Sequence, residues 1–430
     1  MVKFVIVEKL KMKINAIKFK NYKAFKEQQE LEIKPVTIVI GKNSSGKSVL
    51  TRLPLLLAQS LSPEAQGPID LQFDGLEFGG SFKDLVHNKI DHGNITLGFC
   101  LSDGESSVEI NITIQNIADS PVQLISDYEI KSTFGISMRL EWVISDVNLQ
   151  GGPYSYKATG DIEGLVEVNF KGLQINLVKN QKGEVLTITD RIPRLNQLVW
   201  DCFNSIDYIG PFREFPKRDY IYKGSKPESI GYLGELAPQI LGIDSYLDKK
   251  IIESVGEWYK QNLGGWKLDV EKVRDKFEIV LVSPDDPKVK INLVDVGHGM
   301  SQVLPLIVRS FTKRQHPNGL MIIEQPELHL HPAAHGNLIE LFVNMIKEEK
   351  SSWVLETHSE VFLLRLRRMI AEKKLHPDDV IIYLVDDEKR PGSILKKITI
   401  DHDGEVSEWP SGIFSEDFDE VVAIKTANSK

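Results

Sequence analysis

The segment at residues 41–48 has the residue types and spacing that point most directly to chemistry. It reads Gly-Lys-Asn-Ser-Ser-Gly-Lys-Ser and fits the pattern G-x-x-x-x-G-K-[ST] throughout. In this pattern backbone N–H groups at a helix N-terminus cradle the phosphates of a nucleotide, while Lys47 reaches the β- and γ-phosphates and the Ser48 hydroxyl ligates Mg²⁺. We therefore predict a MgATP site. The loop residues predicted to line it are Gly41, Asn43, Ser44, Ser45, Gly46, Lys47, Ser48 and Val49.

A buried strand and a helix must flank such a loop, and the sequence supplies both. Residues 36–40 read Val-Thr-Ile-Val-Ile, which is typical of a central parallel strand covered on both faces. Residues 49–61 then follow a helical pattern. A chance match to the loop pattern is the alternative interpretation, and the correct elements on both sides argue against it.

A second apolar run, residues 320–323, ends in polar side chains. Glu324 follows it directly, and Glu327 lies three residues further on, beyond Pro326. We expect this strand to lie beside the phosphate-loop strand, so that Glu324 meets the Mg²⁺ bound to the nucleotide. The alternative is a surface acid that closes a strand before a proline turn. The predicted metal ligands are therefore Ser48 and Glu324.

A glycine-rich turn at residues 297–302 contains a second set of groups suited to an anion. Gly299, Ser301 and Gln302 stand just before an apolar helical segment. A turn of this kind at a helix N-terminus binds phosphate through backbone N–H groups. Since one nucleotide does not need two such sites on one chain, we expect these three residues to cap the γ-phosphate of ATP held by another copy. A simple N-capped turn is the alternative.

His358 follows a third apolar run, residues 353–355, and is a candidate sensor of the γ-phosphate or of the attacking water. Imidazole can orient or deprotonate water near neutral pH. One predicted helix separates this run from residues 320–323, so the two strands should be neighbours in the sheet. A histidine at a strand end is more often structural, but the expected place beside the acidic strand favours a function.

The order of these segments resembles that of the OLD-type (overcoming lysogenization defect) AAA/ABC ATPases, relatives of RecF and the SMC chromosome-maintenance proteins. The resemblance covers nearly the whole chain. It implies an α/β fold of the ABC-type P-loop NTPase head, in which a mixed sheet flanked by helices carries an antiparallel β-rich insert and a helical subdomain. The segments that carry it are residues 41–48, 295–302, 324–332 and 356–359, and residues 210–213 and 401–419 resemble parts of a short prokaryotic subgroup.

The resemblance also implies a way of working. MgATP would join two chains into a homodimer that acts as a conformational switch, with the turn at Ser301 supplied in trans. A role in phage defence or DNA metabolism follows by association. Full-length OLD nucleases append a large Toprim nuclease module, whereas here only a short stretch with an acidic tail remains after the His358 strand, so we expect any nuclease to be a separate effector polypeptide encoded nearby.

One departure from the family bears on catalysis. ABC-type ATPases place a catalytic glutamate where this chain has Gln325, and an amide cannot accept a proton from the attacking water. We predict slow hydrolysis assisted by Glu327 or His358, with Gln325 orienting the water as the alternative. The candidate catalytic residues are Gln325, Glu327 and His358.

Two other functions compete with a hydrolysing switch. Gln325 favours an ATP-binding scaffold that turns over slowly or not at all and regulates a separately encoded effector such as a nuclease. A transporter's nucleotide-binding subunit is disfavoured, because the L-S-G-G-Q wording is missing and a long β-rich insert is present. His329, His331 and His335 lack the H-E-x-x-H spacing of a zinc helix, so we do not predict zinc.

Composition narrows the remaining choices. The net charge is −9, from 52 Lys+Arg and 61 Asp+Glu, which argues against a nucleic-acid footprint over the whole molecule. Cys100 and Cys202 have neither disulfide nor metal spacing, which suits a reducing cytoplasm. No stretch of about 18 apolar residues supports a membrane span, and Met12 could be the natural start. The lysines that could touch DNA, or merely solvate an edge strand, are Lys3, Lys9, Lys11, Lys13, Lys18, Lys20, Lys23 and Lys26.

The changing residue pattern divides the chain. Residues 14–33 predict a β-hairpin that turns near residues 26–29, and residues 245–262 predict an amphipathic helix. The expected parts are the N-terminal ATPase half at residues 12–66, the β-rich insert at 67–207, a helical lid at 208–292, the C-terminal ATPase half at 293–400 and an acidic tail at 401–430.

Overall fold

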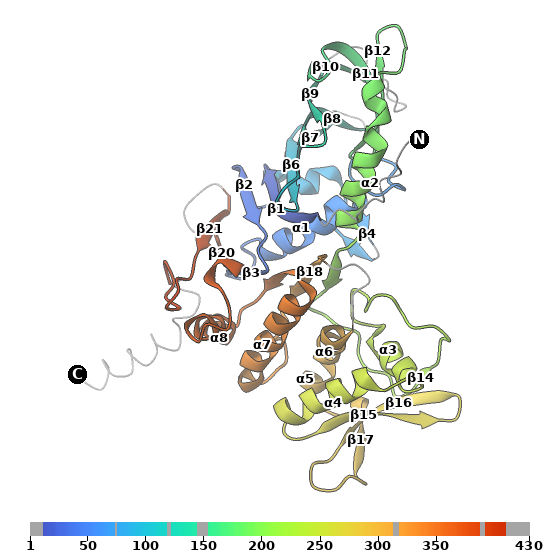
Figure 1. Ribbon diagram of the computed structural model, residues 1–430, viewed down its shortest axis with the longest axis vertical. Helices are drawn as coiled ribbons and strands as arrows, with labels where there is room; N and C mark the ends of the chain where they lie inside the picture. The colour runs from blue at the N-terminus through green and yellow to red at the C-terminus, as the bar shows by residue number, and fades with distance from the viewer. Residues whose placement is uncertain are drawn as a thin grey trace, which may run out of the picture.

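The computed structural model describes residues 12–73, 75–117, 122–143, 154–312, 318–387 and 392–409. The molecule is elongated, with an antiparallel sheet at one end, a helical lobe at the other and a mostly parallel sheet between them (Figure 1). This is an α/β fold with a mixed sheet flanked by helices, as predicted. The predicted tail beyond residue 409 lies outside the described residues.

The first sheet is antiparallel throughout and joins the hairpin β1–β2 to the strands between residues 94 and 180. Its strands alternate buried and half-buried side chains, as expected when one face packs on a core and the other faces water. The predicted hairpin at its edge is confirmed. In sheet order the strands are β12 (Gln174–Asn180), β11 (Gly164–Lys171), β10 (Tyr154–Gly160), β9 (Ile136–Trp142), β8 (Gln123–Ser132), β7 (Ser107–Asn116), β6 (Asn94–Ser102), β1 (Lys13–Lys20) and β2 (Gln29–Glu32).

The second sheet carries the phosphate loop. Every residue of its three central strands is buried, because helices or the first sheet cover both faces. Only the edge pair β20–β21 is antiparallel. In sheet order the strands are β13 (Asp207–Ile209), β18 (Leu320–Glu324), β19 (Ser352–Glu356), β3 (Val36–Gly41), β20 (Val380–Asp386) and β21 (Ile394–Ile398).

The two faces of this sheet belong to two different hydrophobic cores. Val39 of β3 faces a core shared with helix α1 and the antiparallel sheet. Ile38 and Ile40 face the opposite core, shared with the other helices. The alternation of side chains along one strand therefore joins the two ends of the molecule through β3. The helices around the sheet are α1 (Lys47–Ser60), α2 (Ile192–Phe203), α7 (Pro332–Glu349) and α8 (Glu360–Ala371).

One prediction about this sheet is wrong. The strand that ends in Glu324 was expected beside the phosphate-loop strand, but β19 lies between β18 and β3. The other partner of β3 is β20, so both sides of β3 are occupied by later strands. The prediction that β18 and β19 are neighbours is confirmed. Glu356, at the end of β19, is thereby brought to the phosphate loop.

The helical lobe combines helices with a small antiparallel sheet. The helix predicted over residues 245–262 is shorter, because Lys249 has a left-handed backbone (φ 57°) that separates two helices. The elements are α3 (Ala237–Asp244), α4 (Lys250–Asn262), α5 (His298–Gln302), α6 (Leu304–Phe311), β14 (Tyr220–Ile221), β15 (Lys267–Val273), β16 (Lys276–Val282) and β17 (Lys290–Asn292). The remaining short elements are β4 (Gln72–Phe73), β5 (Leu76–Glu77), η1 (Phe82–Leu85), η2 (His87–Lys89), η3 (Thr187–Asp190), η4 (Leu293–Asp295) and η5 (Pro377–Asp379).

Candidate functional site

The phosphate loop leaves β3 and enters α1 through a backbone that only certain residues allow. Gly46 has φ 111° where the helix begins, which a side chain would strain. A Cβ atom on Gly41 would lie 2.8 Å from the Val385 carbonyl oxygen. Asn43 and Ser44 are exposed at the tip, Val49 is half-buried, and the Ser45 hydroxyl is buried without a partner. The loop thus has the glycines, the exposed tip and the helix N-terminus that a phosphate cradle requires.

Lys47 lies folded over this loop. Its Nζ donates to the carbonyl oxygens of Gly41 (3.0 Å) and Lys42 (2.7 Å). Burial lowers the pKa of Lys47, and the charges of Glu356, Asp387 and Glu327 oppose that shift. A buried ammonium that bonds only to neutral carbonyls gains a stronger partner when an anion arrives. The lysine is therefore placed to exchange a carbonyl for a phosphate oxygen.

Two buried carboxylates face the first turn of α1. Glu356 accepts a hydrogen bond from the Ser48 hydroxyl (Oγ to Oε1, 3.2 Å), and Glu324 accepts one from Thr51 (Oγ1 to Oε1, 2.8 Å). Thr51 also reaches Glu356, at 3.5 Å. Arg52 closes the group with two bonds to Glu324, from Nε (2.9 Å) and Nη2 (2.8 Å). The acid in contact with Ser48 is thus Glu356 rather than Glu324.

Burial and repulsion act together on Glu356. Its side chain is buried, and burial followed by the charge of Glu324 raises its pKa to about 7. The Ser48 hydroxyl, Lys47 and Arg52 oppose the shift. A cation bound between the two acids would relieve their mutual repulsion, in addition to the charges of Arg52 and Lys47.

The turns after β18 and β19 carry the three candidate catalytic residues. Gln325 has a left-handed backbone (φ 46°), and its N–H donates to the Glu356 carbonyl oxygen at 2.8 Å. Glu327 Oε1 accepts the backbone N–H of His358 at 2.6 Å, which joins the β18 turn to the β19 turn. His358 is exposed as a residue, but the surrounding chain partly shields its ring from water. This desolvation, followed by the charge of Lys47, lowers the pKa of His358. Gln325, Glu327 and His358 therefore lie on two adjoining turns at one end of the sheet.

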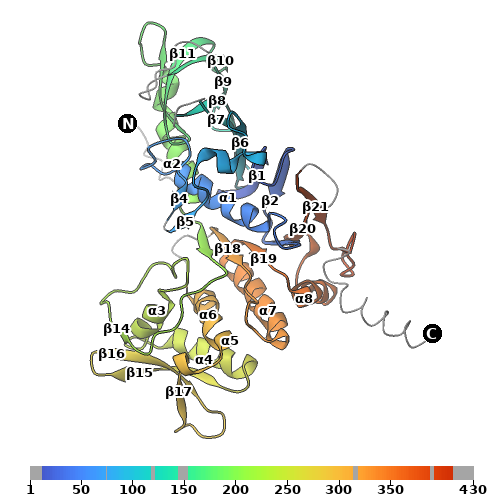
Figure 2. The ribbon, with the colours of Figure 1, turned by 180° about the vertical axis from the view of Figure 1, so that it is seen from behind.

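The turn at Ser301 lies elsewhere. Helix α5 belongs to the helical lobe and lies beside α6, in the core on the opposite face of the second sheet from α1 (Figures 1 and 2). Ser301 is buried, and its hydroxyl donates to the His298 carbonyl oxygen at 3.1 Å. A Cβ atom on Gly299 would lie 2.3 Å from the His329 carbonyl oxygen, so the glycine permits close packing on the β18 turn. The Ser301 turn therefore packs on the turn that follows β18, whereas the phosphate loop lies between β3 and α1.

The Gln302 side chain forms hydrogen bonds to the backbone of Arg213, in the loop between β13 and β14. Its Oε1 accepts the Arg213 backbone N–H, and its Nε2 donates to the Arg213 carbonyl oxygen, both at 3.3 Å. The Arg213 guanidinium is buried and donates from Nη2 to the carbonyl oxygens of Gln325 (3.0 Å) and Glu324 (3.2 Å). The side chain that was expected to contact ATP from a partner thus bonds within its own chain.

Comparison with known proteins assigns the chain to a family. The sequence profile described as the AAA ATPase domain matches residues 12–187 and 223–363. The chain belongs to the AAA ATPase domain family. The matched ranges include the phosphate loop, both carboxylates and the Ser301 turn, while residues 188–222, which include Arg213, fall between them. No curated protein sequence matches this AAA ATPase.

Several solved structures are similar to this AAA ATPase. One is the SMC head bound to the C-winged helix domain of ScpA, with 14% identity, TM-score 0.44 and coverage of 90% of this chain and 98% of the other. The SMC head domain from Thermotoga maritima shows 11% identity, TM-score 0.40 and coverage of 90% and 100%. The third is the Smc head domain with an extended coiled coil, bound to the C-terminal domain of ScpA and derived from Pyrococcus furiosus. It shows 12% identity, TM-score 0.42 and coverage of 97% of this chain and 100% of the other. All three TM-scores are below 0.5.

Reasoning from the sequence missed four polar residues of this AAA ATPase site. Glu356 lies in the segment 356–359 that carries the family resemblance, but its role depends on the strand order, which no local pattern indicates. Thr51 and Arg52 lie one helical turn after the phosphate loop, and that spacing alone could have placed them toward the sheet. Arg213 gave no local signal beyond its position in a Gly-Pro-Phe-Arg segment.

The histidines of the β18 turn have structural partners in this AAA ATPase. His335 is buried between the Ser359 hydroxyl (2.9 Å) and the Leu330 carbonyl oxygen (3.2 Å). His331 caps α7 by accepting the Ala333 N–H. Among the helices that the structure describes, none has the length and apolar character needed to cross a membrane.

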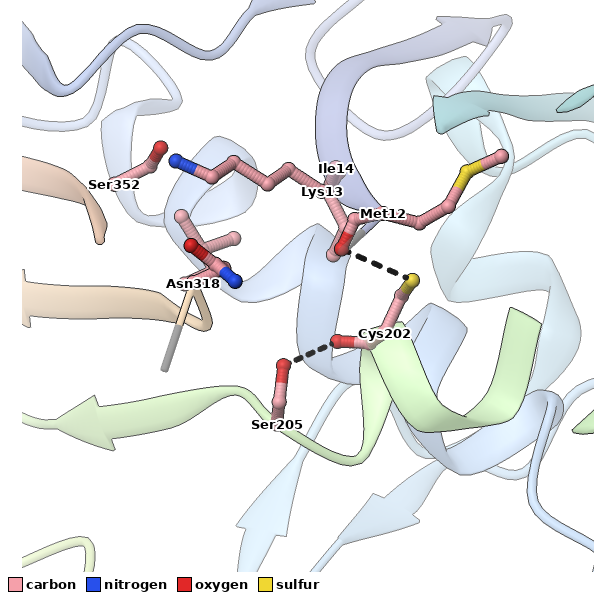
Figure 3. A pocket seen from close by; sticks show the side chains of 8 residues that line it. Met12, Lys13, Ile14, Cys202, Ser205, Asn318 and Ser352 are labelled. Carbon is pink, nitrogen blue, oxygen red and sulfur yellow. Dashed lines mark hydrogen bonds between the residues drawn. The ribbon is translucent and has the colours of Figure 1, made fainter. Parts of the chain in front are cut away.

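The N-terminal lysines are partly engaged inside the chain. Lys13 donates to the Lys350 carbonyl oxygen at 2.5 Å and extends toward Ser352 beside a small cavity (Figure 3). The free thiol of Cys202 lies against the Met12 carbonyl oxygen at this cavity, whose volume of about 10 Å³ leaves room for about one water. This cavity is too small for a ligand.

Two further N-terminal lysines also have partners within the chain. Lys18 forms an ion pair with Glu109 at 2.5 Å, and Lys23 donates to the Phe78 carbonyl oxygen. Lys18 lies on β1, which pairs with both β2 and β6, so the predicted edge strand is wrong for these lysines and β2 is the edge strand instead. The two contacts leave less positive charge for DNA. Lys3, Lys9 and Lys11 lie outside the described residues.

Proposed function

We propose that this chain binds MgATP on residues 41–48 and hydrolyses it slowly, with two copies closing over two nucleotides. The observation that carries the proposal is the convergence of Lys47, Ser48, Glu324 and Glu356 at one end of the second sheet. A phosphate cradle, a cationic side chain and two acids beside a serine hydroxyl are the groups that a nucleotide with its metal requires.

The acids fit Mg²⁺. This ion binds through one or two carboxylates, waters and phosphate oxygens rather than an all-protein cage. In the ranges that the structure describes, no group of three or more His, Cys, Asp or Glu side chains could hold a metal, which suits an ion that arrives with the nucleotide. Ser48, Glu356 and Glu324 would hold it, and when bound it would neutralise phosphate charge.

We assign the handling of the attacking water to the adjoining turns. Gln325 can orient water but cannot take its proton. The Glu327 carboxylate accepts the backbone N–H of His358, so this N–H positions Glu327 as a proton acceptor, and the His358 imidazole is the alternative acceptor. The absence of an acid at residue 325 is the reason for proposing slow turnover.

The second copy enters because α5 lies in the core on the opposite face of the second sheet from α1, the helix that follows its own phosphate loop. The outer part of its turn is formed by Gly297 and His298, which are exposed. For Ser301 to contact a partner's γ-phosphate, its hydroxyl must exchange the local bond to the His298 carbonyl oxygen for a phosphate oxygen. Closure of two copies would then move the antiparallel sheets, which is how ATP would act as a switch.

An ATP-binding scaffold that scarcely hydrolyses is the second candidate, and Gln325 favours it. Turnover of the purified protein, compared with Gln325→Glu, separates the two. Measurable turnover in the wild type, with an increase in Gln325→Glu, supports the hydrolase. Tight binding of ATP with no turnover above background in the wild type supports the scaffold.

The similarity of the motifs to OLD-type ATPases supports a place for the switch in phage defence or DNA metabolism, with a separately encoded effector such as a nuclease. Co-purification from native cells with and without ATP tests for that effector. A filter-binding titration with duplex DNA across salt concentrations tests for DNA, because phosphate contacts weaken steeply as salt rises. Binding that does not depend on ATP in either assay would contradict a nucleotide-controlled partner.

A further inference from the structure

Arg213 contacts both the Ser301 turn and the turn that follows β18, and it has no role in the hydrolysis proposed above. We propose that Arg213 is a positioning residue, through which ATP bound by the partner copy sets the geometry of the Glu327 and His358 turns. This inference rests on the proposed function, because it concerns how the two nucleotide sites of a dimer communicate.

The first step of the connection is the contact with β18. Arg213 is 4% exposed, and its Nη2 donates to the carbonyl oxygens of both Glu324 and Gln325. Glu324 is one of the two acids proposed to hold Mg²⁺, and Gln325 occupies the position at which ABC-type ATPases have a catalytic glutamate. The guanidinium therefore fixes the backbone direction at the end of β18, where Gln325 has a left-handed conformation.

The second step is the contact with α5. Gln302 is the last residue of α5 and directly follows Ser301. Because it bonds to both the N–H and the carbonyl oxygen of Arg213, a shift of α5 must move the Arg213 backbone or break two hydrogen bonds. Contact between the Ser301 turn and a partner's phosphate is the event that would shift α5.

The third step concerns buried polar atoms that lack partners. Nε and Nη1 of Arg213 are buried without a hydrogen bond, and so is Oε2 of Glu327. Burial lowers the pKa of Arg213 to about 10, while the negative charge of Glu327 opposes the shift. Leaving such groups unpaired costs free energy. A second arrangement, in which Glu327 approaches Arg213 and releases the His358 N–H, would satisfy these atoms and gives the turn two states.

The test is the dependence of turnover on ATP concentration in Arg213→Lys. Lysine keeps the charge and the backbone bonds to Gln302 but loses the planar guanidinium, so it cannot reproduce the paired contacts to the carbonyl oxygens of Glu324 and Gln325. The wild type should show a Hill coefficient above 1. In Arg213→Lys we expect a Hill coefficient near 1 and a kcat lower by about 5- to 50-fold, with KM within about 3-fold, since coupling energies of this kind are worth that range.

Arg218→Lys is the matched control. Arg218 lies five residues on and pairs with Asp295 near the same turn (2.6 and 2.9 Å). It is exposed, and among the described residues its side chain makes no hydrogen bond to β18. Its Hill coefficient and kcat should equal those of the wild type. A loss of cooperativity in Arg218→Lys equal to that in Arg213→Lys would overturn the specific role of Arg213.

A second variant covers the case in which Arg213→Lys fails to fold, as judged by its thermal transition. Gln302→Glu keeps the side-chain volume and the acceptor but loses the donor to the Arg213 carbonyl oxygen, so cooperativity should fall while ATP binding stays. Wild-type Hill coefficients in the folded variants would overturn the inference and leave the hydrolase intact. A wild-type protein with no ATP turnover would overturn the proposed hydrolysis and the inference with it.

Discussion

The Ser48 hydroxyl lies 3.2 Å from a carboxylate oxygen of Glu356. This contact joins the residue after the phosphate-loop lysine to the end of β19. Since β19 lies between β18 and β3, Glu356 is the acid that the sheet brings closest to Ser48, and Glu324 reaches the same helix through Thr51 and Arg52. The metal-side group of the proposed site therefore has two acids rather than one.

Changing Glu356→Gln should weaken the response to Mg²⁺. The amide keeps the shape but loses the charge beside Ser48, so the Mg²⁺ concentration for half-maximal ATP turnover should rise by about 10-fold or more. A titration of turnover with Mg²⁺ measures it, and Glu348→Gln, on the exposed side of α7, is the control. An unchanged Mg²⁺ requirement would remove Glu356 from the metal-side group.

The same acid predicts a pH dependence of stability without nucleotide. The pKa of Glu356 is about 7 in the folded protein and near 4.5 when unfolded, so the folded state binds more protons between these values. Stability should therefore fall as pH rises from 4.5 to 7, by up to about 3 kcal/mol. Urea unfolding with EDTA at several pH values, comparing wild type with Glu356→Gln, measures this contribution. Parallel curves for the two proteins would contradict it.

Lys47→Ala should abolish most ATP binding without harming the fold. The side chain now bonds only to two loop carbonyls, whereas phosphate would give it charge-assisted bonds. Affinity for a fluorescent ATP analogue should fall by about 10- to 100-fold. Lys226→Ala, at an exposed position between β14 and α3, is the control and should bind as the wild type does.

Arg52 and Glu324 should depend on each other for stability. Arg52→Met leaves a buried carboxylate without its guanidinium, and we expect a loss of about 1 to 3 kcal/mol, moderated by the partial exposure of Arg52. Adding Glu324→Gln should recover part of that loss. A double-mutant cycle by urea unfolding gives the coupling. Additive effects of the two changes would show that the pair is not coupled.

Much of this fold could be predicted from local pattern. The buried strand before Gly41, the antiparallel hairpins and the neighbouring strands β18 and β19 all follow from periodicity and chain order. The insertion of β19 beside β3 could not be predicted in this way, because strand order depends on which parallel crossovers pack best. That choice decides whether Glu324 or Glu356 reaches Ser48.

Long-range contacts of buried polar groups were equally beyond the sequence. Arg213 is separated from Gln302 by 89 residues and from Gln325 by 112, and no local pattern marks such a pairing. Lys249 breaks a helix that amphipathic spacing predicts as continuous, because a non-glycine residue in a left-handed conformation is set by tertiary packing.

In the proposed dimer, each nucleotide site takes its phosphate loop from one chain and its Ser301 turn from the other. Mixing two inactive variants, Lys47→Ala and Ser301→Arg, tests it most directly, with ATP-dependent dimer formation followed by analytical ultracentrifugation. Neither variant alone should dimerise with ATP. The mixture should do so, because the Ser301→Arg chain binds ATP and the Lys47→Ala chain supplies an intact turn. A mixture that stays monomeric beside a wild type that dimerises, or a Ser301→Arg protein that dimerises alone, would contradict the shared site.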